Sequence, residues 1–80
     1  MPSPPSDGRV RLSPSLVLAI VALLSDLALV HDRMRIDDVV SAAGSREGIP
    51  ARTMRAILRD GYGAAGIPNP VVQDGWVLLS

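Results

Sequence analysis

Three arginines in the second half of the chain, Arg52, Arg55 and Arg59, have the spacing that gathers side chains on one side of a helix. At about 100° per residue they fall close together, while the apolar residues of the same segment lie on another side. These apolar residues are Met54, Ile57 and Leu58. Guanidinium groups suit bidentate contacts to phosphate, guanine or carboxylate. A short helix with an apolar back and an arginine front is typical of domains that read DNA.

The segment around these arginines carries the signals of a helix start and a helix end. Pro50 suits a first helical turn and Gly61 is a natural stop, so we expect a helix from Pro50 to Asp60. Thr53 adds a hydroxyl that can donate to phosphate. Arg46 is expected in the loop from Gly44 to Ile49, where it can hold the nucleic-acid backbone.

The simplest alternative is that these arginines form only the solvated face of an amphipathic helix. No acidic residue stands four positions before Arg55 or Arg59, and solvated helices often intersperse both signs. This absence favours binding over a purely solvated face.

Charge is balanced overall but uneven along the chain. Eight basic residues, all arginine, stand against eight acidic residues. Bulk electrostatic attraction therefore does not hold this protein on nucleic acid. Five of the acids lie in the first half: Asp7, Asp26, Asp32, Asp37 and Asp38. The arginines from Arg46 to Arg59 cluster in the second half, and this clustering is the functional signal.

Other chemistry finds little support in the sequence. The chain has no cysteine, and His31 is its one histidine, so we expect no metal site and no cofactor. His31 and Asp32 are neighbours that point apart on a helix, and His31 suits a structural role near helix-terminal carbonyls. Gly61–Gly66 is glycine-rich but leads to a hairpin, whereas a phosphate loop must feed a helix N-terminus. We therefore expect a non-enzyme.

Eighty residues allow one small domain. Residues 1–12 are rich in proline and serine at their start and are expected to form a disordered arm, with the domain spanning residues 13–80. Arg9 and Arg11 suit such an arm, and a short edge strand over residues 9–12 is the alternative. The absence of cysteine fits a reducing compartment, so we expect a cytoplasmic protein.

The longest apolar segment is expected to form a helix from Ser13, with Pro14 in its first turn, to about His31. Ser25 and Asp26 interrupt it, so the unbroken apolar run is too short for a membrane span. One broad apolar stripe of this helix faces the core. A second stripe on the opposite side has the spacing of a coiled-coil seam: Leu18, Ala22, Ser25 and Leu29. We expect this second stripe to be the interface of a homodimer.

The remaining segments are expected to form a short strand, a helix and a hairpin. The strand covers Met34–Ile36, and a helix capped by Asp37 or Asp38 ends near Ala43, before Gly44. After a loop over residues 61–69, Asp74-Gly75 predicts a type I′ turn within a hairpin over residues 71–79.

The hairpin register that pairs Gln73 with Trp76 makes both faces of the hairpin largely apolar. One face must pack on the helices, and we expect Trp76 to anchor it. The other face needs a partner, such as another protein.

This order of elements resembles the winged helix-turn-helix superfamily over residues 13–80. Residues 33–44 look like its second helix, residues 50–60 like its recognition helix, and residues 74–78 like its final wing strand. The resemblance implies a mainly α three-helix domain with a small β-hairpin. It also implies a transcriptional regulator that binds double-stranded DNA, with its third helix in the major groove and its wing along the backbone. The alternative function is a protein-interaction or dimerisation module of the same fold, because this fold does not fix function.

Overall fold

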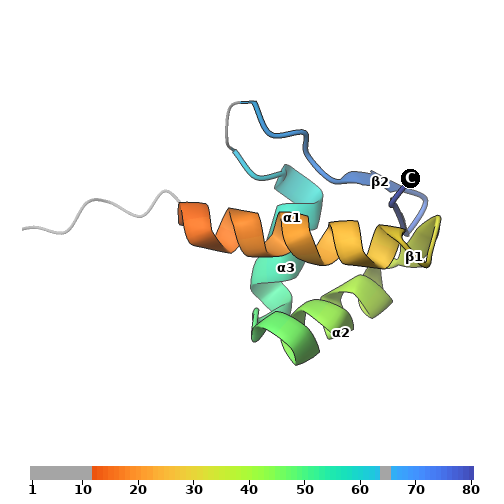
Figure 1. Cartoon of the computed structure of the whole chain (residues 1–80), viewed down its shortest axis with the longest axis horizontal. Coiled ribbons are helices and arrows are strands. Elements are labelled where there is room, and N and C mark those ends of the chain that lie inside the picture. Colours follow the sequence, from red (N-terminus) through yellow and green to blue (C-terminus); the bar gives the residue numbers. More distant parts are fainter. Residues whose placement is uncertain (1–11, 64–65) are drawn as a thin grey trace, which may run out of the picture.

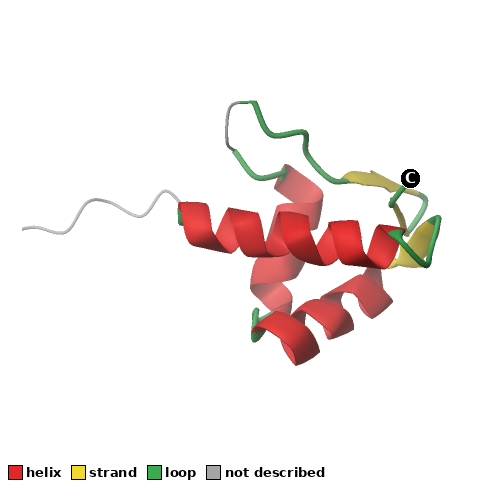
Figure 2. Ribbon diagram, in the orientation of Figure 1, coloured by secondary structure: helices red, strands yellow, loops and turns green. Residues whose placement is uncertain are grey.

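Three helices and a small antiparallel sheet make up the part of the chain that this computed structural model describes, residues 12–63 and 66–80 (Figures 1 and 2). The elements are α1 (Pro14–Ala28), β1 (Arg33–Arg35), α2 (Ile36–Glu47), α3 (Ala51–Asp60), β2 (Val71–Gln73) and β3 (Trp76–Leu78). Their order is the order expected from the sequence. The sheet lies beside the C-terminal end of α1, and α2 and α3 also pack beside that helix (Figure 1).

Helix α1 begins as the sequence predicts. The Ser13 hydroxyl accepts a hydrogen bond from the Leu16 N–H at 3.2 Å, and Pro14 occupies the first turn. The helix ends at Ala28 rather than near His31. His31 is exposed beyond the helix, and its backbone N–H donates to the Leu27 carbonyl at 2.9 Å. The terminal carbonyl is therefore satisfied by the histidine's main chain.

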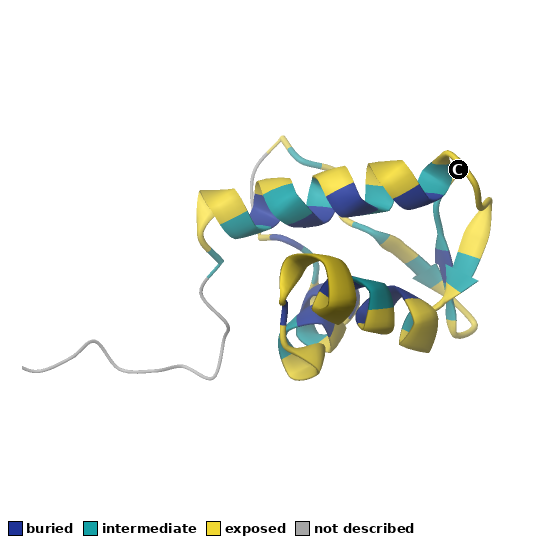
Figure 3. Ribbon diagram, turned by 60° about the horizontal axis from the view of Figure 1, so that its bottom comes forward, coloured by how far each residue is buried: buried dark blue, intermediate teal, exposed yellow. Residues whose placement is uncertain are grey.

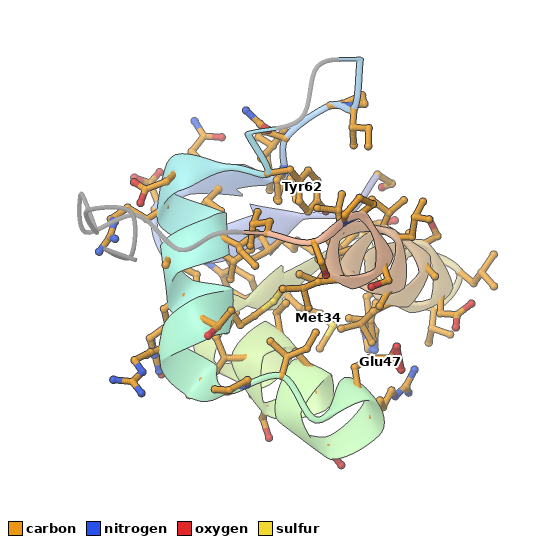
Figure 4. All side chains as sticks on the ribbon, turned by 90° about the vertical axis from the view of Figure 1, so that its left-hand side faces the viewer. Met34, Glu47 and Tyr62 are labelled. Carbon is orange, nitrogen blue, oxygen red and sulfur yellow. The ribbon has the colours of Figure 1, made fainter. Side chains whose placement is uncertain are left out.

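The core is built from aliphatic side chains of every helix and of the central strand. Its largest fully buried members come from α1, α2, α3 and β3: Ile20, Val39, Met54, Ile57 and Val77. Met34 and Tyr62 extend this core toward the sheet and the loop after α3, while Glu47 is exposed at the end of α2 (Figure 4).

Leu12 also packs against the core, so the expected disordered arm over residues 1–12 is wrong for its last residue. The rest of that arm, with Arg9, Arg11 and the alternative edge strand, lies outside the described residues. In the described ranges, no helix combines the length and the hydrophobicity that crossing a membrane requires.

The connection between α2 and α3 differs from the expected six-residue loop. Helix α2 continues through Gly44 to Glu47, and Gly48 ends it in the left-handed conformation, at φ 67° and ψ 22°. The Gly48 N–H donates to the Gly44 carbonyl at 3.2 Å, and buried Ile49 follows. A left-handed helix end favours glycine, and Gly48 rather than Gly44 stands where the chain turns. The connection is therefore only Gly48–Pro50.

The start of α2 also differs from the expectation. Neither Asp37 nor Asp38 caps the helix; both lie in its first turn, where carboxylates complement the positive end of the helix dipole. The Ile36 N–H instead donates to the Gly75 carbonyl of the hairpin turn at 3.1 Å. Ile36 is therefore the first residue of α2 rather than the last of the short strand, and its N–H is satisfied by the turn of the hairpin.

The hairpin register is confirmed. Gln73 pairs with Trp76 and Val71 with Leu78, and the turn has positive φ at both central residues, 53° at Asp74 and 82° at Gly75. This is the geometry of a type I′ turn. Strand β3 also pairs with β1, so the sheet order is β1-β3-β2.

The expected anchoring role of Trp76 is wrong. The sheet turns Val77, which is 0% exposed, toward the helices together with its cross-strand neighbours Met34 and Val72. Because successive residues of a strand point to opposite faces, Trp76 lies on the outer face of the sheet. Both faces of the hairpin are apolar, so the sequence pattern alone did not distinguish them.

Candidate functional site

Helix α3 presents its arginines outward, as the sequence predicts. Arg52, Arg55 and Arg59 are exposed, while the opposite side of the helix is buried in the core. Helix α3 follows α2 after only three residues, Gly48–Pro50, and the two helices are in contact. The buried back and the short connection fix which side of α3 faces solvent.

Arg55 has an acidic partner that comes from another helix. Its Nη2 donates to Oδ1 of Asp37, in the first turn of α2, at 2.6 Å. Both side chains remain largely exposed, at 52% and 79%. Exposed ion pairs contribute at most about 1 kcal/mol, so this pair can open at low cost. The sequence argument for binding rested on the absence of acidic residues four positions before Arg55 and Arg59 in the same helix. It did not include Asp37, which lies in another helix.

Arg59 is paired with the residue that follows it. Its Nε and Nη2 donate to the two carboxylate oxygens of Asp60 at 3.2 and 3.1 Å. The hydrogen bonds and the charge of Asp60 raise the pKa of Arg59 above its ordinary value. Two of the three α3 arginines are therefore partly neutralised.

The other members of the candidate site are spread over two helices. Arg52 is exposed, and its guanidinium makes no hydrogen bond or ion pair within residues 12–63 and 66–80. Thr53 is half-buried on the same helix. Arg46 is exposed but lies in the last turn of α2 rather than in a loop, because α2 continues past Gly44. The structure thus places Arg46 just before the turn that leads to α3.

The turn of the hairpin is held close to α2. The hydrogen bond from Ile36 to the Gly75 carbonyl ties the turn to the first residue of that helix, and the exposed turn residue Asp74 is acidic. Residues 70–80 contain no basic side chain. The hairpin turn therefore adds the negative charge of Asp74 beside the start of α2.

A second pair of arginines, which the sequence analysis did not select, lies on the outer face of the sheet. The guanidinium carbons of Arg33 and Arg35 lie 4.4 and 4.9 Å from the centre of the Trp76 ring. Neither guanidinium makes a hydrogen bond or an ion pair with any described residue. The sequence pattern that could have revealed this pair is the alternation of Arg33, Met34 and Arg35, because alternate residues of a strand lie on one face.

The stripe on α1 that was expected to form a dimer interface is exposed along its length. Leu18 is 63% exposed and Leu29 is 84% exposed, and Ala22 and Ser25 between them are exposed as well. Figure 3 shows this outer side of α1 turned away from the rest of the domain. Within the described ranges, the fold leaves a continuous, mostly uncharged helix surface uncovered.

Comparison with protein-family models, with curated proteins and with solved structures finds no match to this chain. Among the described residues, no three histidine or carboxylate side chains gather closely enough to hold a metal ion.

Proposed function

We propose that this protein binds double-stranded DNA, with α2, the Gly48–Pro50 turn and α3 acting as the helix-turn-helix of a winged-helix domain. The observation that carries the proposal is the exposure of Arg52, Arg55 and Arg59 on one face of α3, whose other face is buried. A connection of three residues also fits the short turn that joins the helices of DNA-binding motifs. In this proposal α3 enters the major groove.

The arginines contribute unequally in this proposal. Arg52 contacts the duplex first because it has no acidic partner to leave among the described residues, and Arg46 and Thr53 position the backbone beside it. Arg55 and Arg59 exchange their carboxylate partners for phosphate oxygens or base edges. Because those exchanges offset part of the gain, we expect modest affinity that falls steeply with salt.

A homodimer formed through α1 accompanies this proposal, since two copies double the number of arginines facing DNA. The exposed stripe is self-complementary when two α1 helices pack antiparallel about a two-fold axis. An axis midway between Ala22 and Ser25 sets Leu18 opposite Leu29 of the second copy. The same axis sets Ala22 opposite Ser25 of the second copy, and these small side chains let the helices approach closely.

The test of DNA binding uses fluorescently labelled mixed-sequence duplex DNA at low and at physiological salt. The variant Arg52→Ala/Arg55→Ala/Arg59→Ala should lose binding while its circular dichroism stays unchanged. Arg33→Ala/Arg35→Ala is the control, because it removes arginines from the sheet instead, and it should keep most of the affinity. Absence of binding by the unaltered protein at low salt contradicts the proposal.

The test of the dimer exploits the absence of cysteine from the chain. A mixture of Leu18→Cys and Leu29→Cys proteins should form a disulfide between the two variants under mild oxidation, whereas Leu18→Cys alone should not. Efficient linking of Leu18→Cys to itself contradicts the antiparallel arrangement. Leu18→Glu should convert the dimer to a folded monomer in analytical ultracentrifugation.

The second candidate function is a protein-interaction module of the same fold. The exposed leucines of α1 favour it, and so does the pairing of Arg55 and Arg59 with carboxylates. In that case the protein self-associates or docks through α1 and binds no DNA at low salt, so the two experiments above separate the candidates.

A further inference from the structure

The outer face of the sheet forms a surface of unusual composition, which we call the arginine–tryptophan surface. Its members are Arg33 and Arg35 of β1, Trp76 and Leu78 of β3, and Val71 and Gln73 of β2. The strand register sets them side by side, with Arg35 opposite Trp76, Arg33 opposite Leu78, and Val71 on the other side of Leu78. Two cations and an indole therefore adjoin an aliphatic strip, of which Val71 is 56% exposed.

The two guanidinium groups of this surface are held in place without being neutralised. Their carbons lie 4.4 and 4.9 Å from the centre of the Trp76 ring, a distance at which a cation is attracted to the ring face. Stacking leaves the N–H edges of a guanidinium free to donate. Within the described ranges, no carboxylate or carbonyl accepts a hydrogen bond from either guanidinium group. The donors are therefore oriented and unused, which lowers the entropy cost of binding a ligand.

We propose that the arginine–tryptophan surface binds an extended acidic peptide segment of a partner protein. Two carboxylates of the peptide, two residues apart, accept from Arg33 and Arg35. Aliphatic side chains of the same segment pack on Leu78 and Val71.

The spacing of the arginines carries the choice of an extended peptide. Residues i and i+2 of a strand lie about 7 Å apart on one face, and alternate side chains of an extended peptide repeat at the same distance. One peptide can therefore match both arginines with two acidic side chains. The positive charge of the arginines and the distance between them thus both indicate an extended acidic peptide.

The aliphatic strip distinguishes a peptide from nucleic acid. Phosphate groups can accept hydrogen bonds from the arginines, but they make no favourable contact with Leu78 and Val71. A peptide with alternating acidic and aliphatic residues can contact both the arginines and the aliphatic side chains. Tryptophan and arginine are also the residues that most often dominate the energy of protein–protein interfaces. The guanidinium groups already lie on the Trp76 ring, so that ring is less open to a stacked base.

The experiment uses Trp76 as its own reporter, because it is the one tryptophan of the chain. A blocked synthetic peptide that alternates glutamate and valine is titrated into the full chain while tryptophan emission is recorded. We expect a saturable change in emission. In Arg33→Gln/Arg35→Gln the affinity should fall about tenfold or more, because charged hydrogen bonds to two carboxylates are lost. Arg46→Gln/Arg52→Gln removes the same charge elsewhere and should bind normally.

Three controls decide the outcome. The matched peptide that alternates glutamine and valine should give no saturable change, and an equal response to it overturns the proposal. A labelled acidic peptide should also bind Arg33→Lys/Arg35→Lys more weakly, and full binding by this variant contradicts the role of oriented guanidiniums. Duplex DNA is the third probe, and a saturable emission change with DNA that requires Arg33 and Arg35, while the acidic peptide gives none, overturns the choice of partner.

This inference does not rest on the function proposed for α3. The Arg52→Ala/Arg55→Ala/Arg59→Ala variant should bind the acidic peptide with unchanged affinity. Loss of DNA binding and loss of peptide binding can therefore be observed separately.

Discussion

Arg55 and Arg59 on α3 direct their guanidinium groups at carboxylates, whereas Arg33 and Arg35 on the sheet lie against an aromatic ring. The α3 pairs are neutral in sum, and a partner must compete with Asp37 and Asp60 for them. The sheet pair keeps its full charge, and Trp76 restricts where the guanidiniums lie. The number of arginines on a helix therefore says less about binding than what each guanidinium already contacts.

The two surfaces also differ in how the fold holds them. The sheet surface is held by backbone pairing on both sides of β3. The C-terminal end of α3 is held by its buried side chains and by a junction, in which Gly61 stops the helix and the Asn69 side chain accepts from the Tyr62 N–H at 3.1 Å. Substitutions at that junction should therefore lower stability more than any change to a single ion pair.

Replacing Gly61 should have the largest effect on stability. Gly61 has φ 86° and ψ −176°, and a Cβ there would lie 2.6 Å from the Asn69 side chain. Gly61→Ala should lower the free energy of unfolding by about 2–3 kcal/mol, because it adds a clash to a backbone conformation that only glycine adopts easily. Urea unfolding followed by Trp76 emission measures the change.

Gly63→Ala is the matched control for that variant. Gly63 also has positive φ, at 68°, but a Cβ there would meet nothing within 4 Å. Its cost should be about 1 kcal/mol, the ordinary cost of a left-handed conformation. Equal costs for the two alanine variants would show that the contact between Gly61 and Asn69 does not hold the end of α3.

Removing the acidic partner of Arg55 should have an effect of intermediate size, on the affinity for DNA rather than on stability. Asp37→Asn removes the carboxylate that holds Arg55 at 2.6 Å. If α3 binds DNA, affinity at low salt should rise about two- to fivefold, in line with the small energy of an exposed ion pair. Acidic-peptide binding should not change. Fluorescence anisotropy with labelled DNA and labelled peptide measures both affinities.

Asp26→Asn is the control for Asp37→Asn, because it removes the same charge from α1. An equal gain in DNA affinity in both variants would mean that only net charge matters. The ion pair with Asp37 would then not be what limits DNA binding by Arg55.

The smallest effect is expected in alkaline solution. Burial raises the pKa of Tyr62 above its ordinary value of 10.0. The folded chain therefore retains the phenol proton when the unfolded chain has begun to lose it. The stabilisation from the buried neutral phenol is fully present below about pH 10 and is lost as the pH rises through the higher folded pKa.

Urea midpoints measured between neutral pH and pH 11 test this linkage. Tyr62→Phe should remove the part of the alkaline slope that belongs to this residue. An unchanged slope in that variant would assign the alkaline loss of stability to other groups.

Local signals predicted the elements whose boundaries depend on nearby residues. Ser13 and Pro14 fix the start of α1, and Asp74-Gly75 fixes the turn and register of the hairpin, because both effects act over a few residues. The predicted end of α2 was wrong because the sequence offers two glycines, Gly44 and Gly48, that can each end a helix. Buried Ile49, which follows Gly48, distinguishes them only once the core is assembled.

The sequence was enough to predict which face of α3 carries the candidate site. It was not enough to predict which acidic side chains pair with the arginines of that face. The spacing of Arg52, Arg55 and Arg59 was enough to place them on one exposed side. The partner of Arg55 lies 18 residues away in the chain, and only the packing of α2 against α3 brings it near. The face of the sheet on which Trp76 lies likewise depends on long-range packing, because Val77 meets the helices only in the assembled core.

The order of strands has a consequence for how the protein is made. Strand β3 is the middle of the sheet, so β1 and β2 have no partner until Trp76–Leu78 leave the ribosome. The residues of all three helices are synthesised before that point. The arginine–tryptophan surface therefore forms only when β3 has been added, and a nascent chain that stops short of it lacks this surface entirely.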